Sequence, residues 1–147
     1  MKPFTFRLEK VLNYRGHLLD RARLELSAAR ARMLAAQEGL SQLTNRREAA
    51  KESCRREGAR SMTGLRYHLY QKFLDGLDRN LDEAHVDLRK RASRVKDCEK
   101  AVASARIQKK VLETLKERGR QAHAEAAARV EQKEMDDMVL IHRGRLK

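Results

Sequence analysis

The residues that could carry chemistry are few and scattered along this 147-residue chain. Histidine and cysteine, the common ligands of transition metals, occur at His17, His68, His85, His123, His142, Cys54 and Cys98. No two histidines are four residues apart, and no cysteine neighbours a histidine at ligand spacing, so we expect no metal site. The sequence has no glycine-rich phosphate loop, and it identifies no base partner for any serine or cysteine. We therefore expect a protein that is not an enzyme and binds no cofactor.

The elements that would position any site show a far stronger pattern, a seven-residue repeat of large apolar side chains. The repeat has two series: Leu12, Leu19, Leu26, Met33 and Leu40, and then Leu74, Leu81, Leu88, Val95 and Val102. On an α-helix such a repeat forms a seam that has to be buried against another helix. Between the series, Gly58, Ser61, Thr63 and Gly64 provide turn and capping chemistry. We predict an all-α fold, an antiparallel two-helix coiled-coil hairpin with a longer C-terminal helix.

The predicted boundaries make the two helices unequal. We expect a single coiled-coil domain over 1–147, with helix one at about 4–57, the turn at about 58–64 and helix two at about 65–143. Pro3 suits the first turn of a helix, where its missing N–H costs nothing. Arg15 and Arg47 are the polar interruptions of the first seam, and Val111, Leu112 and Leu115 depart from the second, which predicts a shift of register.

Folding the chain about residue 62 leaves residues 122–147 without a partner, and we call this segment the overhang. An unpaired amphipathic helix is a candidate binding element, and the alternative is a frayed terminus. The seam pattern leaves a second arrangement open, a parallel dimer formed through the first series. The apolar residues of the overhang are Val130, Met135, Met138, Val139, Leu140 and Ile141.

The charge balance indicates an acidic partner or a solvated basic face. The formal net charge is +13, and residues 89–120 carry twelve Lys or Arg against four acids. Nucleic acid, an anionic membrane and an acidic protein surface are all possible partners. A zipper-type DNA-binding protein needs a basic region of about 20 residues before its leucines, whereas only eleven residues precede Leu12. We therefore expect nonspecific nucleic-acid binding at low salt and no specific site.

Membrane insertion is not expected from the sequence. No segment approaches the roughly 20 apolar residues of a membrane span. The first seven residues lack the apolar run of a secretory signal. We predict a cytosolic protein that is at most peripheral to a membrane.

Four segments, in this order, resemble the FliJ family of the bacterial flagellar export apparatus. They are the opening FTFRLEKVLNYR (4–15), the aromatic-rich LRYHLYQKFLDGL (65–77), the basic KKVLETLKER (109–118) and VEQKEMDD (130–137). The resemblance implies an antiparallel coiled coil similar in shape to the central stalk of rotary ATPases. It also implies engagement of the export ATPase FliI by the open end of the hairpin and of the gate protein FlhA nearer the turn. Export chaperones are further implied partners, and the implied location is the cytoplasmic face of the inner membrane at the flagellar base.

The same resemblance suggests site residues. Phe73 and Leu77, four apart, are similar to the family's gate-docking residues, with packing against the first helix as the structural alternative. The facing stretch Asn45–Ala50 lacks the aromatic residues that some members carry. Injectisome stalks of the YscO type are the closest related group, and a generic basic coiled-coil adaptor is the alternative function. The candidate contacts to the ATPase ring are Arg7, Lys10, Arg15, Lys109, Lys110, Lys116, Arg118, Met135 and Met138.

Overall fold

The computed structural model describes residues 2–145 and contains two long helices. Helix α1 spans Glu9–Arg60, with 52 residues, and α2 spans Gly64–Arg145, with 82 residues. The described range holds helices and no strand, which confirms the all-α prediction, and the C-terminal helix is the longer one, as predicted. The contacts divide the chain into two units. Unit 1 comprises Met1–Asp20 and Ala103–Lys147, and unit 2 comprises Arg21–Val102.

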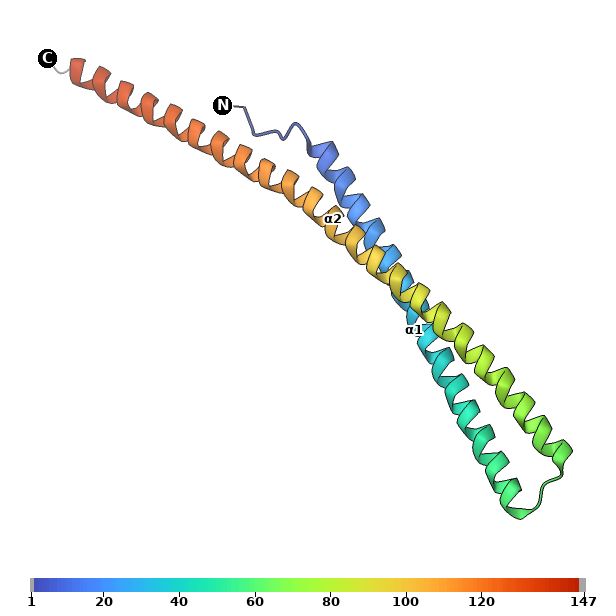
Figure 1. Cartoon of the computed structure of the whole chain (residues 1–147). Coiled ribbons are helices and arrows are strands. Elements are labelled where there is room, and N and C mark those ends of the chain that lie inside the picture. The colour runs from blue at the N-terminus through green and yellow to red at the C-terminus, as the bar shows by residue number, and fades with distance from the viewer. Residues whose placement is uncertain (1, 146–147) are drawn as a thin grey trace. The chain divides into compact units, whose positions relative to one another are not determined.

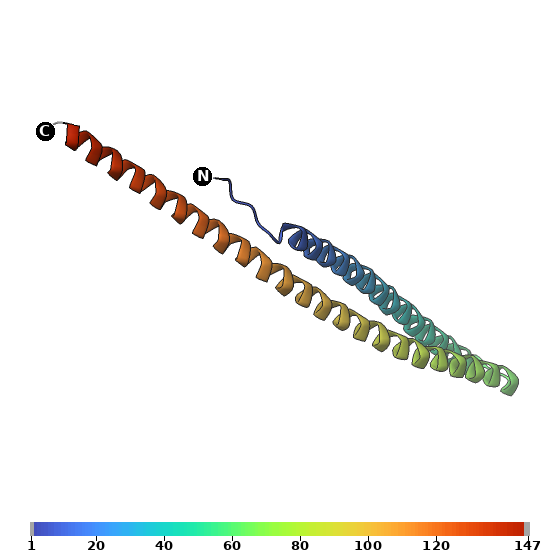
Figure 2. The same cartoon turned by 90° about the horizontal axis from the view of Figure 1, so that it is seen from above.

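Unit 2 is an antiparallel helical hairpin around residues 61–63. Its two helical segments run side by side from this loop in both views (Figures 1 and 2). The seam residues form a thin core in which large side chains alternate with small ones, as in coiled-coil packing. The buried residues of this unit are Leu26, Ala29, Leu77, Val95, Cys98 and Val102.

The polar interruption at Arg47 is neutralised across the hairpin. Its guanidinium Nε donates a hydrogen bond to the Asp78 carboxylate at 2.5 Å. This hydrogen bond raises the pKa of Arg47 above its ordinary value. A second bridge joins the helices where Arg30 donates to Glu99 at 3.4 Å. A seam arginine is therefore compatible with the hairpin because the opposite helix supplies its counter-charge.

The turn of unit 2 is shorter than expected, since α1 continues through Gly58 to Arg60 and α2 begins at Gly64. No glycine in the described residues has a positive φ, so the turn does not use glycine in a left-handed conformation. Instead, the Thr63 hydroxyl accepts a hydrogen bond from the Arg66 backbone N–H at 3.3 Å. Thr63 is thus the N-cap of α2, one of the two residues expected for that role.

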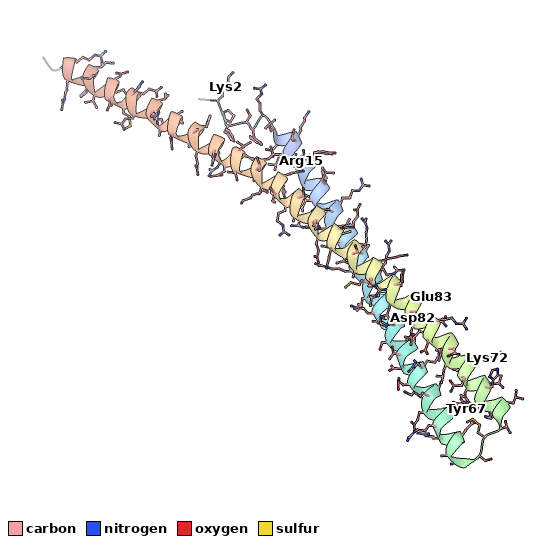
Figure 3. The ribbon with its side chains drawn as sticks, in the orientation of Figure 1. Lys2, Arg15, Tyr67, Lys72, Asp82 and Glu83 are labelled. Carbon is pink, nitrogen blue, oxygen red and sulfur yellow. The ribbon has the colours of Figure 1, made fainter. Side chains whose placement is uncertain are left out.

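In unit 1, the start of α1 packs against the part of α2 that follows Val102. Leu12 and Leu19 supply its buried apolar core, with 9% and 3% of their surfaces exposed. Lys116 forms an ion pair with Glu9 at 2.8 Å. Arg15, the other polar interruption, donates a hydrogen bond to the Gln108 side chain at 2.6 Å, and Figure 3 marks its position on α1.

The segment before α1 is not helical, although Pro3 suits a first helical turn. Helix α1 begins at Glu9, later than the expected start near residue 4. The Phe4 ring packs on His123 at a centroid distance of 5.8 Å, and His123 Nε2 lies 2.9 Å from the Lys2 carbonyl oxygen. These contacts anchor the segment on α2 in a non-helical conformation.

The overhang is helical as far as Arg145, and Leu146 and Lys147 lie outside the described residues. His123 and Ala127 are half-buried, and every residue from 128 to 145 is exposed. Figures 1 and 2 show α2 running past the N-terminal segment of unit 1. The structure therefore agrees with the prediction that this part of α2 lacks a helical partner within its unit.

Both cysteines are free thiols. Cys98 is buried and Cys54 is half-buried, so each occupies a seam position as a small apolar side chain. The structure thus gives both residues a structural role.

Candidate functional site

Large apolar side chains that remain exposed are the candidate binding features, and one row of them follows the loop of unit 2. Leu65, Leu69 and Phe73 are 73%, 58% and 51% exposed, and we call them the first stripe. The next residue at this spacing, Leu77, is only 4% exposed. A step of four residues advances about 40° around a helix, so the row turns steadily from solvent into the seam.

This geometry separates the two residues predicted to dock to the gate. Phe73 lies on the open side of the row and lines a shallow groove of about 260 Å³ with Arg66, Leu69 and Tyr70. Leu77 lies in the core of unit 2, which is the structural alternative to docking. Tyr67, labelled in Figure 3 close to the loop, is 54% exposed and adds aromatic surface to this end of the unit.

A hydrogen-bonded cluster holds the first stripe against the end of α1. The Glu57 carboxylate accepts hydrogen bonds from the Arg66 guanidinium and from the Tyr70 hydroxyl, the latter at 2.8 Å. These bonds hold the pKa of the Glu57 carboxyl below its ordinary value. The bond to Glu57 raises the pKa of both Arg66 and Tyr70. The cluster bridges the loop and orients the first two turns of α2.

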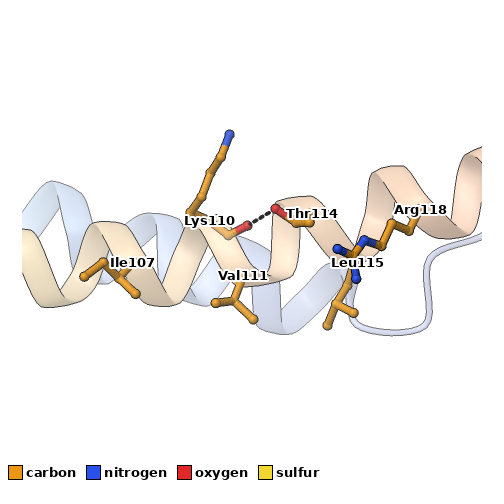
Figure 4. Close-up of a pocket in the computed structure, with 6 residues that line it drawn as sticks. All are labelled: Ile107, Lys110, Val111, Thr114, Leu115 and Arg118. Carbon is orange, nitrogen blue, oxygen red and sulfur yellow. Dashed lines mark hydrogen bonds between the residues drawn. The ribbon is translucent and has the colours of Figure 1, made fainter.

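A second row of exposed apolar residues lies on α2 in unit 1. Ile107, Val111 and Leu115 are 65%, 55% and 45% exposed, and we call them the second stripe. Figure 4 shows the three side chains following one another along the helix, with Lys110 extending away from them. The next residue at this spacing is Gly119, where an added Cβ would lie 3.3 Å from the Phe4 ring. This row, too, turns toward the paired face of the helix.

The second stripe corrects the expected shift of register. Lys109, Leu112 and Lys116 are half-buried at the three- and four-residue spacing of the seam. Val111 and Leu115 point away from that seam. Val111 and Leu115 therefore belong to a separate exposed row, whereas Leu112 belongs to the seam, which keeps its phase. In both stripes, apolar residues follow one another every four residues at positions outside the seam. This pattern is visible in the sequence and could have identified both stripes.

The cations predicted to contact an ATPase ring fall into two groups. Arg15, Lys109 and Lys116 are half-buried and already bound to Gln108, Glu113 and Glu9. The structure thus gives these three a role inside unit 1. The exposed group consists of Arg7, Lys10, Lys110 and Arg118.

The overhang exposes the other predicted ring contacts. Met135 and Met138 are 62% and 66% exposed, and Val139, Leu140 and Ile141 follow at 53%, 65% and 60%. Gln132 donates a hydrogen bond to Asp136 at 3.1 Å along the same helix. Flexible thioether side chains suit adaptable protein contacts.

Residues 2–145 contain no group of three or more His, Cys, Asp or Glu side chains that could hold a metal ion. Within the same range, no helix is long and apolar enough to cross a membrane. The paired acids Asp82 and Glu83, labelled in Figure 3, are both exposed on α2.

Comparison with known proteins identifies a family and a solved structure of similar fold. Residues 4–145 match the family model of the flagellar FliJ protein. Among solved structures, the chain is similar to CT670 of Chlamydia trachomatis, described as a YscO homolog. The identity is 20%, the TM-score is 0.58 and the match covers 96% of each chain, so this likeness concerns the fold. No curated protein matches the sequence.

Proposed function

Because the chain belongs to the FliJ family and is therefore a component of the flagellar type III protein export apparatus, we propose that it is a non-enzymatic stalk. In this role it binds the export ATPase FliI and couples it to the gate protein FlhA at the cytoplasmic face of the inner membrane. The observation that carries the proposal is that each unit keeps large apolar side chains exposed although it has its own buried core. Exposed apolar rows of this kind are typical of protein-binding surfaces.

The first stripe supports the contact to the gate. Phe73 is the aromatic residue of this stripe, and Leu69 and Leu65 extend the apolar surface toward the loop. Aromatic side chains often dominate the binding energy of an interface. Leu77 acts from inside unit 2 by supporting the turn of helix that carries Phe73, so the docking role predicted for both residues is here proposed for Phe73.

The exposed cations and the overhang support the contact to the ATPase. Arg7 and Lys10 present charges near the start of α1, and Met135 and Met138 present apolar surface on α2. Charged groups steer association and apolar groups supply affinity, so this combination suits a partner with acidic and apolar patches.

Binding to purified FlhA cytoplasmic domain tests the gate contact. We expect Phe73→Ala to weaken binding about tenfold, a typical cost for truncating a central aromatic residue. Leu34→Ala is a matched control, because Leu34 lies on α1 of the same unit with 55% of its surface exposed. Equal affinities of the Phe73→Ala and wild-type chains would argue against the gate contact. For the ATPase, adding the chain to FliI should change ring assembly or hydrolysis, and the proposal fails if neither changes.

A further inference from the structure

The second stripe forms the floor of a groove that the seam of unit 1 does not use. The groove has a volume of about 290 Å³ and is lined by Ile107, Lys110, Val111, Thr114, Leu115 and Arg118. Its surface is predominantly apolar. The one hydroxyl in the lining, on Thr114, donates a hydrogen bond to the Lys110 carbonyl oxygen at 2.9 Å (Figure 4). The groove therefore offers apolar contact with no unsatisfied hydroxyl in its wall.

Two cations, Lys110 and Arg118, lie at the rim of this groove. Within residues 2–145, neither Lys110 nor Arg118 makes an ion pair, and both are exposed. They are eight residues apart, which places them about 12 Å from each other along the helix axis, one toward each end of the apolar row. Three nearby cations of α2 are paired, Lys109 with Glu113 at 3.7 Å, Lys116 with Glu9 at 2.8 Å and Arg120 with Glu117 at 2.8 Å.

We propose that this groove is the docking site for an amphipathic helix of a partner protein whose apolar face is flanked by aspartate or glutamate. An apolar row with four-residue spacing is the surface against which a second helix packs. A carboxylate on each edge of that helix would meet Lys110 and Arg118, which have no counter-charge of their own. The groove supplies the apolar contact, and the two cations select the charge and set the register.

The same groove on a second copy of this chain fits it poorly. In an antiparallel pairing centred on residue 114, Lys110 of one copy would face Arg118 of the other. In a parallel pairing in register, Lys110 would face Lys110. Like charges opposed in this way are unfavourable, so charge complementarity selects an acidic partner.

This inference shares one element with the proposed function, because both assign Lys110 and Arg118 to a protein partner. The groove, however, binds by the chemistry of a helix and can be tested without the ATPase or the gate. If the chain did not contact FliI, peptide binding at the groove would remain. If the peptide did not bind the groove, the contact with FliI would remain possible through the other exposed cations and the overhang.

The probe is a fluorescein-labelled designed helix of about 20 residues, long enough to form helix on binding. It carries leucine at three- and four-residue spacing and glutamate along both edges, and a second peptide replaces each glutamate with lysine. Anisotropy titrations with the full-length chain measure affinity at about 0.05 M and about 0.5 M salt, which separates screened from apolar contributions.

Two variants and two matched controls locate the contact. Val111→Asp disrupts the apolar floor, and Val86→Asp changes another exposed valine of α2, 42% exposed in unit 2. K110E/R118E reverses the rim, and R89E/K96E makes the same change of charge at two exposed sites elsewhere on α2. Circular dichroism verifies that each variant keeps its helix content.

We expect Val111→Asp to weaken binding of the glutamate peptide about tenfold or more, since an apolar anchor is replaced by a charge. K110E/R118E should reverse the preference, so that the lysine peptide binds better than the glutamate peptide. Val86→Asp and R89E/K96E should change affinity by less than about twofold, because these residues lie outside the groove.

Three results would overturn the proposal. The first is the absence of saturable binding by the glutamate peptide. The second is an equal loss for K110E/R118E and R89E/K96E, which would show attraction by net charge without a site. The third is self-association of the wild-type chain in sedimentation analysis that Val111→Asp abolishes, which would assign the groove to a second copy.

Discussion

The first and second stripes have the same spacing on the same helix, yet they present different chemistry. Each row loses exposure step by step: 73%, 58% and 51% in the first, and 65%, 55% and 45% in the second. In the first stripe the neighbouring Arg66 is bound to Glu57, so the surface offered to a partner is mainly apolar and aromatic. In the second, Lys110 and Arg118 have no ion pair among residues 2–145. Two rows of the same spacing thus differ in their flanking charges, and we infer that this difference selects different partners.

The largest effect should separate Phe73 of the first stripe from Leu77, the buried residue that follows it at the same spacing. We expect Leu77→Ala to lower the free energy of unfolding by about 2–4 kcal/mol, because it opens a cavity in a buried seam. Phe73→Ala should lower it by less than about 1 kcal/mol, since half of that side chain is already in water. Urea unfolding followed by circular dichroism measures both. Similar losses for the two variants would show that Phe73 is structural and would remove the distinction between the ends of the row.

The next effect tests how the second stripe ends at Gly119. Alanine is favoured over glycine in a helix by about 1 kcal/mol, and Gly39→Ala should gain this amount because nothing lies within 4 Å of its added Cβ. Gly119→Ala should gain less, since its Cβ would meet two atoms of the Phe4 ring at 3.3 Å and 3.4 Å. Unfolding measurements compare the two variants, and the NMR signals of His123 report displacement of Phe4. Equal gains with unchanged His123 signals would show that Phe4 does not cover the end of the row.

A smaller effect should distinguish the paired from the unpaired cations of unit 1. Lys116→Ala should cost about 0.5 kcal/mol, the usual value for an ion pair with partly exposed partners. Lys110→Ala should leave stability unchanged and alter only partner binding. A double-mutant cycle with Glu9→Ala isolates the pairwise contribution. If the coupling energy between Lys110 and Glu9 were as large as that between Lys116 and Glu9, Lys110 would not be an unpaired cation at the rim of the groove.

The smallest effect concerns the pH dependence of the cluster beside the first stripe. The pKa of Glu57 is lowered in the folded chain, so its bonds to Arg66 and Tyr70 stabilise the fold above the unfolded pKa of about 4.3. This contribution is lost as the pH falls through the lower, folded pKa. The coupling between Glu57→Gln and Arg66→Gln should therefore be measurable at neutral pH and vanish in acid. A coupling that stays constant across that range would show that the cluster adds nothing through the charge of Glu57.

Much of the fold could be predicted from the repeat of apolar residues. Leu12, Leu19 and Leu26 lie in the core as the seven-residue spacing requires, and Val95 and Val102 do so on the other series. The ends of the helices were less predictable. Pro3 permits a helical start, but the contacts of Phe4 and Lys2 with His123 outweigh that local preference. Gly58 permits a turn, but α1 continues through it to Arg60, and Thr63 caps the start of α2.

By itself, the sequence determined the helical class, the positions of the two seams and the family, because these depend on residue types at fixed spacing along one chain. Tertiary structure alone decided which exposed residues form a site. In the sequence, Leu77 lies on the second seam, three residues after Leu74, and Phe73 lies beside that seam. Packing against the opposite helical segment leaves Leu77 4% exposed and Phe73 51% exposed. Lys110 and Lys116 are both candidate contacts in the sequence, and only the structure places Glu9 opposite Lys116. A row of residues spaced by four turns about 40° around the helix at each step. The position of the neighbouring helix therefore decides which residues of the row are buried.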